Sequence, residues 1–128
     1  MTSLEILLWI KIIGTLIPVA FPLLFFPKSV IDQRSGFEAS DASLYRLYGM
    51  AVLALLVGYF AGIVQVWHDE YPTGIIAMGF VSNAGAFLIM LITGRAKRMP
   101  LSAAFFGLIA AGLASSHLSQ NLFMNQIW

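Results

Sequence analysis

Four long apolar stretches, separated by short polar segments, dominate the pattern of this 128-residue chain. Three of them, residues 47–67, 71–94 and 99–128, contain no Asp, Glu, Lys or Arg. Each is long enough to cross a hydrocarbon core of about 30 Å at about 1.5 Å per helical residue. The stretches are too long for barrel strands and do not alternate polar with apolar residues, so we predict four transmembrane helices.

The spans follow from the ends of these stretches. We expect one transmembrane domain over residues 1–128, with spans at about 4–26, 44–67, 73–94 and 101–121. Pro18 and Pro22 each remove a backbone donor from the first span, which should therefore kink or end early. The segment from Pro27 to Gly36 fits a short interfacial helix, with proline at its start and glycine at its end.

The basic residues predict the orientation. Six of the seven Lys and Arg residues fall in the first and third gaps between spans: Lys28, Arg34, Arg46, Arg95, Lys97 and Arg98. Because short basic loops stay in the cytoplasm, both termini should lie outside, which places Trp9, Trp67 and Trp128 at the outer interface. We therefore expect an all-α, four-transmembrane-helix bundle, N-out and C-out, with a kinked first helix and a short cytoplasmic interfacial helix.

Composition excludes several classes of function. The chain is 59% hydrophobic and 10% charged, which leaves little polar sequence for a soluble domain. It has no Cys, so disulfides, thiolate metal sites and thiol redox chemistry are excluded. A net charge of +1 without a basic tail argues against nucleic acid. No nucleophile elbow, metalloprotease signature or phosphate loop occurs, so we expect neither an enzyme nor a metal site, and the sequence leaves the cofactor open.

Small residues recur at four-residue spacing in the later spans. They are Gly58 and Gly62 in the second span, Ser82 and Ala86 in the third, and Ala103, Gly107, Ala111 and Ser115 in the fourth. Such stripes let helix backbones approach closely in lipid. They either pack the four helices together or present one face to a partner subunit.

Two polar residues lie inside the spans. Asn83 is near the middle of the third span, where an unpaired amide is costly, so it should point inward as an interhelical clamp or as a ligand or ion contact. Lys11 lies about one turn below Trp9, and its long side chain should snorkel to the headgroups. The alternative for Lys11 is a place on a proton or anion path.

Several polar side chains are also expected at the outer ends of the spans. His68 and His117 fall at span ends there, and together with Glu5, Lys11, Gln65, Asp69 and Glu70 they form an outer polar layer. That layer could hold a metal, a quinone headgroup or an axial ligand for a tetrapyrrole. Two isolated histidines without ligand spacing are more often a solvated loop residue and a helix-end hydrogen bonder. Glu5 should not share the helix face of Lys11, because six residues rotate a side chain by about 240°.

One stretch carries a family resemblance. Phe25-Phe26-Pro27, a polar loop, and then residues 43–49 (SLYRLYG) opening a small-residue span resemble small uncharacterised four-helix bacterial membrane proteins. The resemblance implies a bacterial inner membrane and no particular activity. Small multidrug transporters are similar in size and helix number, but Glu5 is too close to the N-terminus to match the carboxylate that family uses deep in its first helix.

These observations lead to a functional expectation. We expect a non-catalytic accessory or structural subunit of a larger membrane complex, in contact with the lipid bilayer and with other membrane subunits or further copies of itself. Short loops, the lack of a buried ionisable cluster and small-residue stripes beyond internal need support it. The alternatives are a small transporter or channel with a polar path at Lys11, Asn83 and His117, or a membrane protein that binds quinone, lipid or pigment.

Overall fold

The computed structural model describes residues 1–127, and that range is 82% helical with no strand. Trp128, which the sequence places at the outer interface, lies outside the described residues. The helices are α1 (Ser3–Thr15), α2 (Phe21–Phe25), α3 (Lys28–Ser35), α4 (Ser43–Trp67), α5 (Thr73–Ile92), α6 (Arg95–Arg98), α7 (Pro100–Leu118) and α8 (Gln120–Met124).

Four segments are long and apolar enough to cross a membrane, as predicted: Ser3–Phe25, Ser43–Trp67, Thr73–Ile92 and Pro100–Leu118. They indicate a multi-pass membrane protein. The fourth span ends at Leu118 rather than near residue 121, because Ser119 leaves the helical conformation with φ −132° and ψ 53°. Helix α8 follows directly.

The first span accommodates its two prolines by a local change of helix type. Leu16–Ala20 forms a π-helical segment between α1 and α2, in which the Phe21 N–H bonds to the Leu16 carbonyl five residues earlier. A π turn widens the helix where Pro18 and Pro22 would otherwise collide with the preceding turn. The chain therefore remains helical to Phe25 instead of ending at the prolines.

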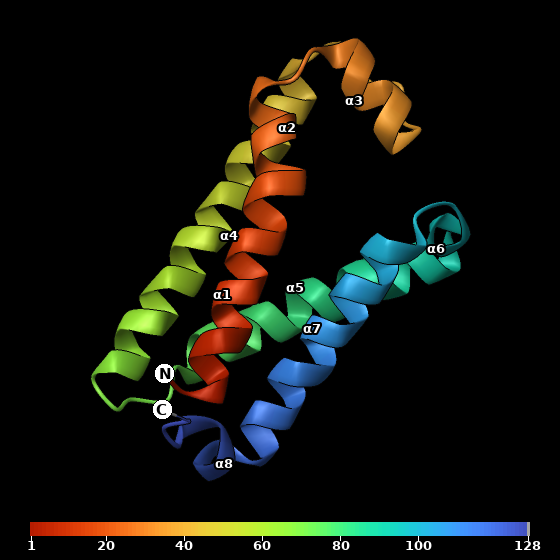
Figure 1. Ribbon diagram of the computed structural model, residues 1–128. Coiled ribbons are helices and arrows are strands. Elements are labelled where there is room, and N and C mark those ends of the chain that lie inside the picture. Colours follow the sequence, from red (N-terminus) through yellow and green to blue (C-terminus); the bar gives the residue numbers. More distant parts are fainter. Residues whose placement is uncertain (128) are drawn as a thin grey trace.

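The spans associate as two pairs, shown in Figure 1. The first pair consists of α1 and α2 packed along α4, and the second consists of α5 packed along α7. The pairs meet in the half that contains the chain termini, here called the terminal end, where one core includes Leu8, Tyr59, Ile76 and Leu113. They diverge toward the opposite half, here called the basic end, which contains α3 and α6.

The terminal end is closed by contacts between the first and last residues. Thr2 and Glu5 form a capping box at the start of α1. The Met1 amino group donates to the Gln126 side chain at 3.0 Å, and the Ile127 N–H donates to the Met1 carbonyl at 2.9 Å. These bonds hold α8 against the start of α1.

Helix α3 lies between Pro27 and Gly36, as predicted. Gly36 adopts a left-handed conformation with φ 68°, which glycine tolerates and which ends the helix. The Asp32 carboxylate accepts hydrogen bonds from Lys28, at 2.6 Å, and from the Tyr45 hydroxyl. These two bonds hold the pKa of Asp32 below its ordinary value, and the bond from Tyr45 fixes α3 to the start of α4.

Helix α3 also reaches the second helix pair. Arg95 of α6 donates to the Ser35 carbonyl at 2.8 Å, and its guanidinium lies 3.4 Å from the centre of the Phe37 ring. Within the first pair, Arg46 of α4 donates to the carbonyls of Leu23 and Phe26, both at 2.7 Å. Polar contacts therefore join the two pairs at the basic end, where their spans are apart.

Gly79 provides a test of the packing between the pairs. A Cβ at position 79 would lie 2.7 Å from the Tyr59 hydroxyl and 2.8 Å from Leu113, so Gly79→Ala should destabilise the protein by about 1–3 kcal/mol. Gly85 of the same helix faces open space, and Gly85→Ala should leave stability unchanged or raise it through helix propensity. Unfolding in detergent, followed by circular dichroism, measures both. Equal stability of the two variants would contradict this packing.

Candidate functional site

Lys11 lies inside the helix bundle. Its side chain is 4% exposed, on the face of α1 that also buries Leu8 and Ile12. The ammonium nitrogen lies 5.9, 5.2 and 5.0 Å from the ring centres of Tyr59, Phe105 and Phe106, respectively. The prediction that Lys11 snorkels to the headgroups is therefore wrong, because its helix face points to the interior and the rings of α4 and α7 enclose it.

The three rings offset part of the cost of placing an ammonium group in an apolar interior. Insertion of a lysine at the centre of a membrane helix costs about 2.5–3.5 kcal/mol on insertion scales. A cation–π contact returns about 0.5–2 kcal/mol, so three contacts are of comparable size. Within residues 1–127 the ammonium has no hydrogen bond or ion pair with the protein. All three of its donors are thus available.

Asn83 is fully buried and joins α5 to α4. Its amide nitrogen donates to the Tyr59 hydroxyl at 2.9 Å and to the Gly79 carbonyl at 2.7 Å. The amide oxygen is buried and has no hydrogen-bond partner among residues 1–127. An unsatisfied buried acceptor costs about 1–3 kcal/mol, so this oxygen marks a place where a donor would be stabilising.

Thr15 and Tyr59 belong to the same region, although the sequence analysis did not select them. Thr15 lies one turn after Lys11 on α1, is 4% exposed, and has a buried hydroxyl oxygen without a hydrogen-bond partner. Its spacing of four residues from Lys11 was a usable signal, since such residues share a helix face. We use the name Lys11 cluster for one set of side chains: Lys11, Thr15, Tyr59, Asn83, Phe105 and Phe106.

The Lys11 cluster lies close to the point where the helix pairs diverge. Phe105 packs against Gly14 of α1, where any side chain would collide with the ring, since a Cβ would lie 2.8 Å from it. Four residues further toward the basic end on each helix, Pro18 and Leu101 are exposed. The ring of Phe105 therefore packs α1 against α7 next to an exposed part of both spans.

Glu5 is buried at the terminal end with partners of its own. The Trp67 indole N–H donates to the Glu5 carboxylate at 2.9 Å, which links α1 to the end of α4. Glu5 and Lys11 lie at opposite edges of the buried face of α1, so they are buried together although they point in different directions.

The two histidines are exposed and have separate partners. His68 bonds through Nδ1 with the Val64 carbonyl at 2.7 Å, and the His117 ring centre lies 6.3 Å from that of Tyr71. Among the described residues no group of three or more His, Cys, Asp or Glu side chains could hold a metal. The outer polar layer is therefore not assembled around one point.

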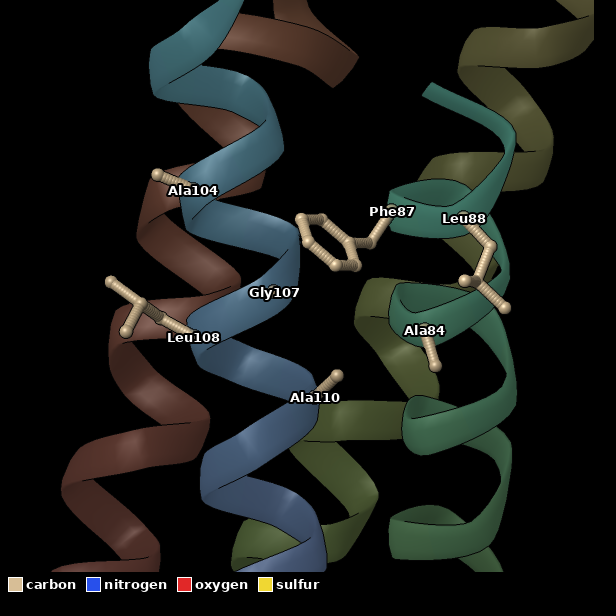
Figure 2. Close-up of a pocket in the computed structure, with 7 residues that line it drawn as sticks. All are labelled: Ala84, Phe87, Leu88, Ala104, Gly107, Leu108 and Ala110. Carbon is tan, nitrogen blue, oxygen red and sulfur yellow. The ribbon is translucent and has the colours of Figure 1, made fainter. Parts of the chain in front are cut away.

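Most of the small residues that the sequence predicts to pack helices together contact helices of the same chain. Cβ atoms at Gly58 and Gly62 would lie 3.4 and 3.0 Å from Met78 and Ile75 of α5. Figure 2 shows Phe87 of α5 directed toward Gly107 of α7, where a Cβ would lie 3.2 Å from the ring. Ala111, in contrast, is exposed.

An apolar groove lies between α5 and α7. Its lining is shown in Figure 2: Ala84, Phe87, Leu88, Ala104, Gly107, Leu108 and Ala110. It contains no ionisable side chain, so it offers contact for lipid or for another helix rather than a site for chemistry. Comparison with protein-family models, with curated proteins and with solved structures finds no match.

The bond between Asn83 and Tyr59 can be measured by a double-mutant cycle. We expect Asn83→Leu and Tyr59→Phe each to destabilise the folded protein by about 0.5–2 kcal/mol, since each removes an interhelical hydrogen bond. The double variant should lose less than the sum, because both changes remove the same bond. Unfolding in detergent gives the three free energies. Strict additivity would show that the two side chains are not coupled.

Proposed function

We propose that this protein is a small, non-catalytic membrane transporter that binds an anionic substrate at the Lys11 cluster. The observation that carries the proposal is a buried lysine whose ammonium has no acceptor among residues 1–127. Lys11 lies eight residues after the start of α1, about 12 Å along the helix axis. Charged residues at such depth are rare and commonly serve substrate or ion pathways.

The polar atoms around Lys11 support an anion in particular. The ammonium supplies up to three donors and a full positive charge, and the Thr15 hydroxyl can supply another donor. No carboxylate of the described chain forms an ion pair with Lys11. An entering anion would supply the missing countercharge, and in a low-dielectric interior that attraction is strong.

The arrangement of the two helix pairs supports transport. The pairs share a packed core at the terminal end and diverge at the basic end, and Lys11 lies on α1 between the core residues Leu8 and Ile12. In our proposal the packed core closes the site toward one membrane face, and the substrate enters from the basic end, past the Phe105 ring that packs on Gly14. In our proposal the basic end faces the cytoplasm of a bacterial cell and the termini lie outside the inner membrane, in accordance with the positive-inside rule.

Substitution of Lys11 tests the transport proposal. In proteoliposomes we expect a saturable signal with at least one of acetate, phosphate and palmitate, measured by electrophysiology on a supported membrane. Lys11→Gln should lower the signal about tenfold and Lys11→Arg should retain it, because only arginine keeps the charge. Lys97→Gln, the same charge change at an exposed residue, is the control. No signal with any anion, or equal signals from Lys11→Gln and wild type, would contradict the proposal.

A second candidate is an accessory subunit that packs against other membrane subunits or against a further copy of this chain. The supporting observation is the outer face of α7, where the small residues Ala104, Ala111 and Ser115 are exposed beside the apolar groove of Figure 2. Small residues on a lipid-facing surface permit close approach of another helix. The remaining members of the small-residue stripes have less room for a partner, since Gly62 and Gly107 contact neighbouring helices of the chain.

Ala111→Leu tests the accessory role without disturbing the fold. The larger side chain should separate a partner helix, so gentle extraction should yield a smaller complex than wild type, measured on native gels against the 14.0 kDa of the chain. Ala54→Leu, at an exposed position of α4, is the matched control. Gly107→Leu is unsuitable, because Phe87 lies too close. Migration of the wild type as a monomer would argue against this role.

A further inference from the structure

We infer that the anion bound at the Lys11 cluster is the carboxylate of a long-chain fatty acid, whose alkyl chain lies between the two helix pairs. The inference rests on the proposed function, since it names the substrate class of the same site. It combines two neighbouring features: an unpaired cation in an aromatic enclosure, and exposed apolar side chains beyond it on the first and fourth spans, among them Phe25 and Leu101.

The enclosure fits a small anion with one charge. A single ammonium can neutralise one carboxylate, whereas a phosphate dianion would leave a net negative charge in the interior. The rings of Phe105 and Phe106, whose centres lie 5.2 and 5.0 Å from the ammonium, leave little room for a bulky headgroup. The unpartnered Thr15 hydroxyl is a donor for the second carboxylate oxygen.

The surfaces beyond the enclosure fit an alkyl chain. Phe105 packs against Gly14 of α1, and Leu101, one turn further toward the basic end on α7, is 85% exposed. From Lys11 to Phe25 the first span continues for 14 residues, about 21 Å, without a charged side chain. That length exceeds the roughly 15 Å of one hydrocarbon leaflet, so a chain of about 16 carbons can lie along it. Beyond Thr15 a hydrophilic anion would find no polar side chain on this wall.

Binding of radiolabelled palmitate to the purified protein in nanodiscs of zwitterionic lipid tests the inference. We expect saturable binding, and about tenfold weaker binding of methyl palmitate, which lacks the charge, and of acetate, which lacks the chain. Hexadecyl phosphate should also bind more weakly. Lys11→Gln should lower the affinity for palmitate about tenfold, and Lys11→Arg should retain it.

A comparison of two equally exposed leucines on α7 distinguishes loss of the alkyl site from a general effect of a charge on the protein surface. Leu101, next to the proposed chain, is 85% exposed, and Leu118, at the other end of the helix, is 84% exposed. Leu101→Glu should weaken palmitate binding, whereas Leu118→Glu should not. Equal losses in both variants, or equal binding of acetate, methyl palmitate or hexadecyl phosphate, would overturn the inference.

The outcomes for binding and for transport are distinguishable. Palmitate binding that depends on Lys11, without flux in proteoliposomes, would support the fatty-acid site and refute the transporter. Flux of acetate or phosphate that depends on Lys11, without palmitate binding, would support the transporter and overturn the fatty-acid site.

Discussion

Burial of the Lys11 ammonium is the constraint to which the centre of this molecule is adapted. An ammonium in an apolar interior needs nearby electron density, and rings from α4 and α7 supply it. Those rings reach Lys11 only because small residues make room for them. Gly14 admits Phe105, and Gly79 admits Tyr59. Side chains of three spans thus meet around the Lys11 ammonium, and Asn83 holds Tyr59 in place through a hydrogen bond to its hydroxyl.

The two ends of the bundle are held by different physical means. At the terminal end a continuous apolar core draws on all four spans, and hydrogen bonds between the termini complete it. At the basic end the spans are apart, and the connection depends on charged and hydrogen-bonding groups of α3 and α6. Packing of an apolar core is spread over many contacts and is hard to disrupt locally, whereas a few polar contacts at a water interface open at low cost. Relative motion of the helix pairs is therefore easiest at the basic end.

Much of the fold could be predicted from the sequence, because span length, charge-free composition and proline and glycine at the ends of α3 are local signals. Burial of Asn83 followed in the same way, since an amide in lipid must find a partner. The position of Lys11 could not be obtained from depth alone. Burial of its side chain depends on which face of α1 meets the other helices, and that is a property of tertiary packing. For the same reason no signal in the sequence indicated that Phe105 and Phe106 surround Lys11, or that His68 and His117 have separate partners.

The enclosure of Lys11 also has a consequence for biosynthesis. Two of its three rings, Phe105 and Phe106, belong to the last span, whereas Lys11 belongs to the first. Chains are made from the N-terminus at about 5–20 residues per second, so the lysine is synthesised seconds before these rings exist. During that interval α1 must reside in the membrane with an ammonium that has no aromatic cover, or wait at its edge until α7 arrives. The pairing of Met1 with Gln126 and Ile127 likewise forms only after residues 126 and 127 have been synthesised. The contacts that cover the first span are therefore the last to form during membrane integration. Until they form, the nascent first span is the least stable part of the protein.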